Sequence, residues 1–221
     1  YLAIGGMVPL SADSILLALD SVSKKIKKDT KIHLLGFAKI DRIKEFQKYN
    51  LYSFDTTSPL LRAFKDNKHN LIMPGKKDDL TYYTAFRIPQ STENRSLMRL
   101  IKNNLFSYEE VHIKEKNSLK LLRSFEDGSA QLEETLQSLI EYSKIYLTDH
   151  NYPDKDNSVK LERLNGDYKK LLQDKPWEKC DCQVCKKCGI QMAIFRGSNR
   201  NKRRGMHNLH VFNNQLKKIC N

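Results

Sequence analysis

The first quarter of the chain contains three short apolar runs: YLAIGGM at residues 1–7, KIHLLGF at 31–37 and NLYSF at 50–54. Each run is short enough to be a strand and is bounded by polar or glycine residues. Between the runs, apolar residues recur with helical spacing over 15–26 and again over 40–46. Strands that alternate with helices are typical of a parallel sheet or a β/α barrel. We therefore predict an α/β fold.

The first of these helices has recognisable ends. Ser11 precedes the apolar pattern and offers an N-cap. Four lysines suit the last turn, where they would face the negative end of the helix dipole: Lys24, Lys25, Lys27 and Lys28.

The middle of the chain, residues 66–175, is more polar and less regular. Its pattern predicts a strand around TYYTAFRI at 81–88, helices near 93–105 and 129–147, and a loop over 151–160. Five residues of the second helix share one apolar face, which we interpret as core: Leu132, Leu136, Leu139, Ile140 and Tyr146.

The net charge of +13 is concentrated near the C-terminus, where residues 175–221 hold 11 Lys or Arg against two acids. A basic surface of this kind attracts polyanions, so we favour nucleic acid over a merely solvated loop. Four residues are candidates for phosphate contacts: Arg200, Lys202, Arg203 and Arg204. The chain has no apolar run of about 18 residues and no signal-peptide pattern, so we expect no membrane contact and a cytoplasmic location.

Four of the five cysteines lie within CDCQVCKKC at 180–188, which suits a metal site better than a disulfide framework. Zinc takes four ligands in a tetrahedron, and closely spaced thiolates supply two or three of them. Three natural ligands are Cys180, Cys182 and Cys185. The fourth ligand is Cys188, His207 or His210, and we predict a structural Zn²⁺ ion.

The cysteine cluster and a downstream His-Asn-Leu sequence together resemble a known motif. A Cys-x-Cys-x-x-Cys cluster, followed some twenty residues later by His-Asn-Leu at the head of a helix, is similar to the zinc motif of the queuine and archaeosine tRNA-guanine transglycosylase superfamily. Here the motif is CDCQVC from Cys180 and HNL from His207. The resemblance implies that His207 is the fourth ligand and Cys188 an extra cysteine. It also implies a structural zinc subdomain that helps to hold nucleic acid.

IGGM at 4–7 is similar to the Gly-Gly-Leu turn of the same family, which follows a barrel strand. The resemblance implies that Gly5, Gly6 and Met7 recognise the guanine-like base. Glycines that only end a strand are the simpler interpretation of this motif alone.

YSFDTTSP at 52–59 resembles the family segment that carries the nucleophile, which implies that role for Asp55. Taken without the family, Asp55 is a turn or capping residue before a helix whose N-cap is Ser58 and whose first residue is Pro59. The arginine that usually follows the proline by two is displaced to Arg62, a further candidate for nucleic-acid contact.

The resemblance implies base exchange by a pentosyltransferase. Attack by Asp55 on the anomeric carbon of a nucleotide would displace guanine and leave a covalent glycosyl ester. An incoming 7-deazaguanine, such as 7-cyano-7-deazaguanine, would then displace the ester, and two displacements retain the configuration.

The chain departs from the family in two ways. A complete (β/α)8 TIM barrel takes about 250 residues, so we expect 1–65 to be the last three β/α units only. We expect the other barrel half, with the general acid and base, before Tyr1 in the same chain or in a partner subunit, and this piece alone to be inactive. Because 125 residues separate Asp55 from Cys180, we expect a mostly helical insertion over 66–175, followed by a zinc-binding subdomain and final barrel helix over 176–221.

The insertion and the displaced arginine resemble the DpdA-type branch, which places 7-cyano-7-deazaguanine in DNA. We therefore favour DNA over tRNA as the partner. A tRNA-guanine transglycosylase and a non-catalytic zinc-containing nucleic-acid-binding module stay open as alternatives, and a homodimer stays open as the assembly.

Overall fold

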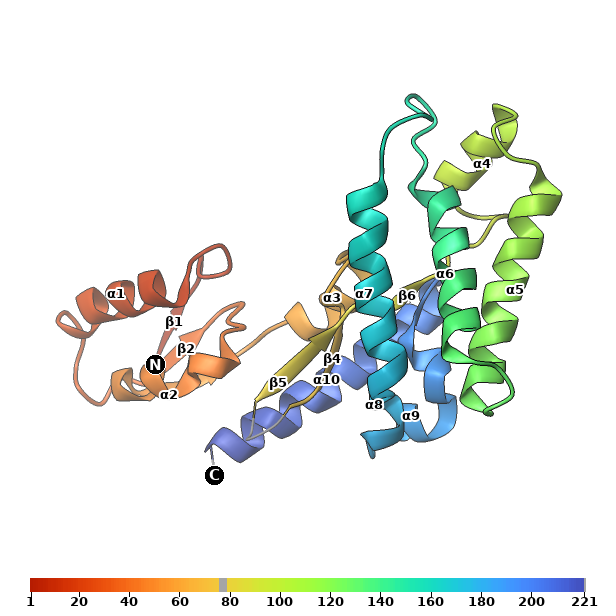
Figure 1. The fold of residues 1–221 in the computed structure, drawn as a ribbon. Coiled ribbons are helices and arrows are strands. Elements are labelled where there is room, and N and C mark those ends of the chain that lie inside the picture. Colours follow the sequence, from red (N-terminus) through yellow and green to blue (C-terminus); the bar gives the residue numbers. More distant parts are fainter. Residues whose placement is uncertain (76–78, 221) are drawn as a thin grey trace.

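The computed structural model describes residues 1–75 and 79–220. It has an α/β unit at the N-terminal end and a larger helical part at the other end, and the C-terminal helix runs between them (Figure 1). The predicted α/β class is confirmed at this level.

The N-terminal unit contains three strands that pair in parallel in the order β1-β2-β3. Its elements are β1 (Leu2–Ile4), α1 (Ala12–Ser23), β2 (Ile32–Leu34), η1 (Ile40–Arg42), α2 (Ile43–Phe46), η2 (Gln47–Tyr49) and β3 (Leu51–Phe54). Apolar side chains from the helices and strands bury one another in a small core that includes Leu19, Leu34 and Phe46. The strand–helix alternation expected from the sequence is therefore present.

Helix α1 begins as predicted but ends earlier than expected. The Ser11 hydroxyl accepts a hydrogen bond from the Ser14 N–H, which makes Ser11 the N-cap. The helix ends at Ser23 and has no basic residue in its last turn. The expectation that the following lysines lie in that turn is wrong, because they follow the helix in the connection to β2.

The next segment contains a short helix and then two paired strands, which lie inside the range 66–175 that we expected to be a mostly helical insertion. Helix α3 (Ser58–Lys65) is followed by the antiparallel pair β4 (Leu71–Pro74) and β5 (Leu80–Tyr83). The N-cap of α3 is Thr57, one residue earlier than predicted.

The single strand predicted over 81–88 is two strands. The first part belongs to β5, and the second, β6 (Phe86–Arg87), pairs in parallel with β7 (Ile194–Phe195) more than a hundred residues later. The backbone must change partner between them, so the run cannot be one element.

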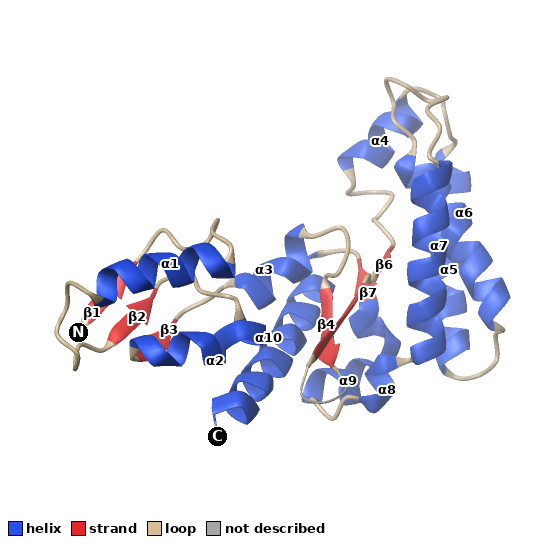
Figure 2. Cartoon of the chain, turned by 60° about the vertical axis from the view of Figure 1, so that its left-hand side comes forward, coloured by secondary structure: helices blue, strands red, loops and turns tan. Residues whose placement is uncertain are grey.

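The insertion is a helical stack. Its helices are α4 (Arg95–Lys102), α5 (Tyr108–Glu126), α6 (Leu132–Leu147) and α7 (Ser158–Asp174). Figures 1 and 2 show α5, α6 and α7 side by side. The predicted apolar face of α6 is confirmed, because Leu136 and Leu139 are buried and the other three residues of that face pack against the same core. The pattern predicted α4 and α6 but missed the separate helices α5 and α7.

The C-terminal region consists of short elements and one long helix. They are α8 (Pro176–Lys179), α9 (Gln183–Cys188), η3 (Gly189–Ala193), β7 and α10 (Ser198–Cys220). His207 therefore lies near the middle of α10 and not at the head of a helix, as the motif suggested.

One continuous core joins the hairpin, the insertion and the cysteine region. It contains residues from β4, α5, α6, α7 and α9. The described residues of the expected insertion and of the zinc-binding region therefore share one core. Helix α10 also reaches the N-terminal unit, where Leu216 and Ile219 pack against the core of that unit.

The described residues do not show the predicted barrel. Their strands form one three-stranded sheet and two two-stranded pairs, and no closed (β/α)8 barrel is present in 1–75 and 79–220. Within the same residues, no helix is both long and apolar enough to cross a membrane.

Candidate functional site

Four buried side chains converge at one point of the C-terminal region. Cys180, Cys182, Cys185 and His207 each offer one ligand atom, and these atoms all lie within 4.8 Å of one another. The His207 Nδ1 atom is 3.8 Å from the Sγ of Cys180, 3.3 Å from that of Cys182 and 3.4 Å from that of Cys185. The cluster could bind a metal ion. These are the four residues that the family resemblance implied.

Local structure fixes the orientation of these ligand atoms. Cys182 is the N-cap of α9, and its sulfur accepts a hydrogen bond from the Cys185 N–H at 3.3 Å. On the other side of the cluster, His207 Nε2 donates to the Ile72 carbonyl at 2.7 Å. That bond places the ring proton on Nε2 and leaves Nδ1 free to act as a ligand.

The four groups also change one another's proton affinities. The hydrogen bond from Cys185, more than any other cause, lowers the pKa of Cys180 well below its usual range. Burial lowers the pKa of His207, but its hydrogen bonds to Cys180 and Cys182 outweigh burial and raise that pKa to about 9. The buried sulfurs therefore favour a positive charge beside them, and a metal cation supplies one.

Cys188 lies outside the cluster. It is half-buried at the end of α9, and its sulfur is not among the four grouped ligand atoms. His210 lies one turn beyond His207 on the exposed side of α10, where its Nε2 is 2.9 Å from the Asn214 side-chain amide. Neither residue competes with His207 in this geometry.

The second candidate site lies where the parallel strands end. Because β1, β2 and β3 run in the same direction, the segments that follow Ile4, Leu34 and Phe54 meet at one edge of the sheet. Gly5 and Gly6 are exposed there, and Gly6 has the left-handed φ of +77° that favours glycine. Met7 differs from them because its side chain is buried in the N-terminal core.

Asp55 connects two of these segments. Its Oδ1 accepts a hydrogen bond from the Gly36 N–H at 2.5 Å, and its own N–H donates to the Leu34 carbonyl at 3.3 Å. Gly36 has a φ of +72°, and a Cβ there would lie 2.4 Å from the Val8 side chain. The close turn at Gly36 thus permits the bond that orients the Asp55 carboxylate.

A groove of about 510 Å³ runs beside this edge. Its wall includes Met7, Gly36 and the residues Thr56–Ser58 that follow Asp55. Arg62 and Tyr82 also line the groove, and the Arg62 guanidinium lies 5.1 Å from the centre of the Tyr82 ring. The groove therefore places Arg62 near the segments that contain Gly5, Gly6 and Asp55.

The basic run of α10 divides into exposed and buried members. Lys202 and Arg203 are exposed, and Arg200 is half-buried. Arg204 is fully buried, and its guanidinium donates to the carbonyls of Ile194 and Ala63. The expectation that Arg204 contacts phosphate is corrected, because this side chain holds α10 against α3.

Asn208 is a second buried residue that fastens α10 to its neighbours by hydrogen bonds, and the sequence did not predict this role. Its amide donates to the carbonyls of Pro59 and Asn70, each at 3.1 Å, and its oxygen accepts from the Ile72 N–H at 2.9 Å. Asn208 adjoins the ligand His207, and Pro59 lies four residues after Asp55. The only available signal was the Asn of the His-Asn-Leu motif.

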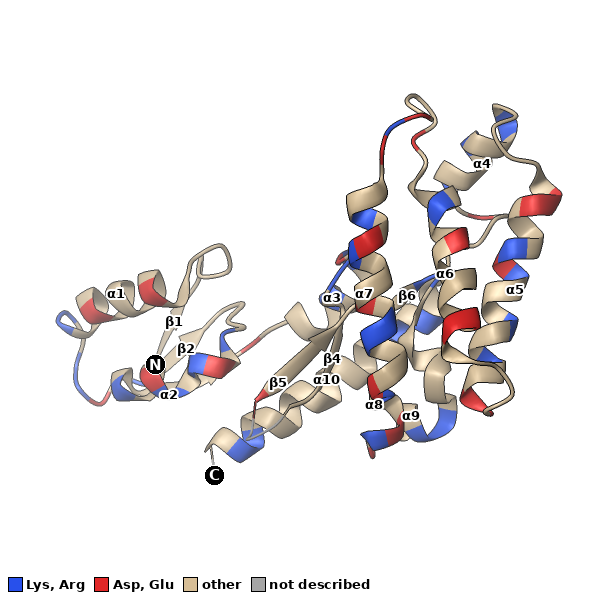
Figure 3. Ribbon diagram, in the orientation of Figure 1, with Lys and Arg blue, Asp and Glu red and all other residues tan. Residues whose placement is uncertain are grey.

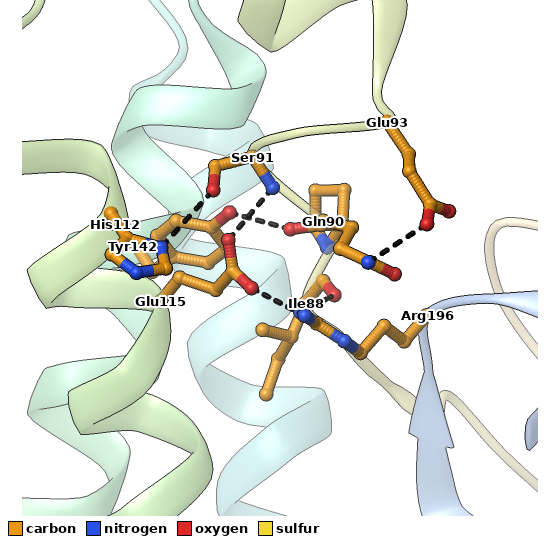
Figure 4. A network of polar contacts seen from close by, with 9 residues as sticks. Ile88, Gln90, Ser91, Glu93, His112, Glu115, Tyr142 and Arg196 are labelled. Atoms are coloured by element: carbon orange, nitrogen blue, oxygen red, sulfur yellow. Dashed lines mark hydrogen bonds and ion pairs between the residues drawn. The ribbon is translucent and has the colours of Figure 1, made fainter. Parts of the chain in front are cut away.

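A third network fixes the insertion to Arg196, which lies between β7 and α10 (Figure 4). The buried carboxylate of Glu115 on α5 pairs with Arg196 and accepts the Ser91 N–H at 2.7 Å. Arg196 also donates to the Ile88 carbonyl at 3.2 Å. Sequence patterns cannot pair residues 81 positions apart, so this contact was not predicted.

No protein-family model matches the chain. The chain is 36% identical over 215 residues to a DNA-guanine transglycosylase of Salmonella montevideo. The match covers 97% of this chain and 49% of the relative, so the chain spans about half the length of the curated relative it matches.

The 36% identity over nearly the whole chain supports the transglycosylase superfamily, which the three motifs implied. Within that superfamily, the matched relative carries the name DNA-guanine transglycosylase.

Proposed function

We propose that the chain is part of a base-exchange transglycosylase that replaces guanine in nucleic acid, preferably DNA, with a 7-deazaguanine such as 7-cyano-7-deazaguanine. The observation that carries the proposal is the meeting of Gly5, Gly6 and Asp55 at one edge of the parallel sheet, beside a groove. In β/α folds, ligands bind and reactions occur at this edge. The similarity to a DNA-guanine transglycosylase supports the same reaction.

Asp55 is the proposed nucleophile. The Gly36 N–H holds its Oδ1, and Oδ2 makes no hydrogen bond to any described residue, so Oδ2 is the oxygen that we assign to attack on the anomeric carbon. The pair of electrons on Oδ2 forms the new C–O bond while the bond to guanine breaks. The incoming base then displaces the ester, and the second inversion restores the original configuration.

The glycine turn is the proposed base-recognition segment. Gly5 and Gly6 are exposed and carry no side chain, so their backbone N–H and C=O groups are accessible to the edge of a planar base. For Met7 we propose a backbone role only, because its side chain belongs to the core.

The cluster is the proposed site of a structural Zn²⁺ ion. Tetrahedral zinc with bonds of about 2.3 Å to sulfur and about 2.0–2.1 Å to nitrogen has S···N edges of about 3.6 Å. The three observed S···N distances of 3.3–3.8 Å fit these edges. Four protein ligands fill the tetrahedron and leave no position for substrate, so the role is structural.

Covalent trapping tests this proposal. The intact protein is incubated with duplex DNA or with tRNA and then denatured, and a nucleic-acid adduct on Asp55 is sought by mass spectrometry. We expect an adduct with DNA, no adduct in Asp55→Asn, and uptake of labelled 7-deazaguanine that depends on Asp55. Adducts with tRNA alone would favour the tRNA enzyme, and binding without any adduct would favour a non-catalytic module.

A further inference from the structure

The insertion helix α5 carries a basic stripe that none of the motifs explains. Lys116, Lys120 and Arg123 are spaced by four and three residues, so they lie on one face of the helix. All three are exposed. Between residues 111 and 125 the helix has one acid, Glu115, and this acid is buried against Arg196. Figure 3 shows the basic positions recurring along α5.

The stripe continues onto the cysteine region. Arg123 lines a shallow hollow together with Lys186 and Lys187 of α9. Glu126 at the rim accepts the Ile190 N–H, so its carboxylate is already engaged in the fold. Arg123 thus joins α5 to the basic end of α9.

The same arginine is close to the start of α10. Burial lowers the pKa of Arg200, and repulsion from Arg196, Arg123 and Arg203 lowers it further. The buried Nη1 of Arg200 has no hydrogen-bond partner among the described residues. Arg196 is already paired with Glu115, so Arg123, Arg200 and Arg203 are the neighbouring cations whose repulsion a bound anion would relieve.

A helix face that only interacts with water usually mixes both signs of charge. Helix α7 does so, because Glu162 and Asp167 alternate with its basic residues. The α5 stripe has no such partner: within 1–75 and 79–220, Lys116, Lys120 and Arg123 make no ion pair. Apart from Glu126, the exposed charges that line this surface on α5, α9 and α10 are positive, and such an excess indicates a polyanionic partner.

We propose that these side chains form a second DNA-binding surface, which holds the phosphate backbone of a duplex away from the groove. We call it the α5 surface, and its members are Lys116, Lys120, Arg123, Lys187, Arg200 and Arg203. The inference rests on the proposed function, which makes DNA the partner. From Lys116 to Arg123 the helix rises about 10 Å, which is about three base-pair steps of 3.4 Å.

The position of α5 determines which DNA it can reach. In Figures 1 and 2, α5 lies at the opposite end of the molecule from β1, β2 and β3. The surface therefore binds a segment of a long duplex at a distance from the nucleotide in the groove. The Glu115–Arg196 pair joins α5 to the segment that leads into α10, which limits how far the members on the two helices can move relative to one another.

A charge-matched pair of variants tests the α5 surface in the intact zinc-loaded protein. The test variant is Lys116→Gln, Lys120→Gln, Arg123→Gln. The control is Lys25→Gln, Lys27→Gln, Lys28→Gln, which removes the same charge from exposed residues of the N-terminal unit. Glutamine is a good helix former, so α5 keeps its structure, which circular dichroism checks.

Affinity for a long duplex is measured at several salt concentrations. Each phosphate contact contributes about 0.9 to the slope of log K against log[salt], so the test variant should lose about 2–3 units of slope and on the order of 100-fold in affinity at about 0.1 M salt. The control should stay close to wild type. Exchange on a long duplex should show a raised KM and an unchanged kcat.

Equal slopes for the test and control variants, with wild-type binding and exchange intact, would overturn the α5 surface and leave the proposed function standing. Loss of tRNA binding with DNA binding unchanged would overturn the commitment to DNA. A wild-type protein that neither binds nor modifies nucleic acid would overturn both proposals.

Discussion

Replacing Asn208 with alanine tests how α10 is joined to the rest of the molecule. The substitution removes three buried hydrogen bonds and leaves the Pro59 carbonyl, the Asn70 carbonyl and the Ile72 N–H without their partner. Each buried polar group left unsatisfied costs about 1–3 kcal/mol, and neighbouring losses do not add fully. We expect the free energy of unfolding to fall by about 3–5 kcal/mol.

Urea unfolding of the metal-loaded protein, followed by circular dichroism, measures this change. The control is Asn213→Ala on the same helix, whose side chain is exposed and makes no hydrogen bond to the described residues. That variant should stay within about 0.5 kcal/mol of wild type. A loss below about 1 kcal/mol for Asn208→Ala would refute the reasoning, because it would mean that the three groups find other partners without cost.

Three further outcomes follow from the geometry. Cys188→Ser should keep the metal content of wild type, whereas His207→Ala should lose most of it, as measured by elemental analysis of the purified proteins; equal contents would contradict the ligand set. Gly205→Ala would place a new Cβ 2.6 Å from the Leu60 side chain at the α3–α10 crossing; overpacking costs about 1–3 kcal/mol and alanine returns about 1 kcal/mol of helix propensity, so thermal unfolding should show a net loss of stability of up to about 2 kcal/mol. Burial raises the pKa of Glu115, but hydrogen bonds from Ser91 and Arg196 outweigh burial and lower it. The ionised Glu115 carboxylate therefore stabilises the fold above its unfolded-state pKa of about 4.3, and this contribution is lost as the pH falls through the lower folded-state pKa. Unfolding titrations should show this acid-dependent loss of stability in wild type and not in Glu115→Gln.

The sequence predicted the elements whose signals are local. Strand β2 and helix α1 follow directly from a short apolar run and from a capped 3.6-residue pattern. Strands β6 and β7 have two residues each, and they exist because distant segments pair with each other. No local pattern encodes a pairing across such a separation. The apolar pattern over 81–88 therefore predicts one continuous strand, although its second half pairs with β7.

The candidate site shows the same division. The spacing of Cys180, Cys182 and Cys185 indicated three ligands, but the sequence alone left the fourth open until the family resemblance selected His207. The run of basic residues that contains Arg204 predicts an exposed side chain that contacts phosphate. At about 100° per residue, Arg204 lies on the same helix face as Asn201 and Asn208, both of which are buried, whereas Lys202 lies on the opposite face.

Helix α10 connects the Cys3His cluster to the groove, although none of the four candidate ligands lines the groove. His207 is a candidate ligand, and the next residue, Asn208, holds the carbonyl of Pro59 at the start of α3. Asp55 lies three residues before α3, so the position of its carboxylate depends on where that helix begins. A cluster that fixes α10 therefore also fixes α3 and, through it, the segment that carries the proposed nucleophile. On this geometry, loss of the metal would displace Asp55 through α10 and α3, even though the cluster has no position for substrate.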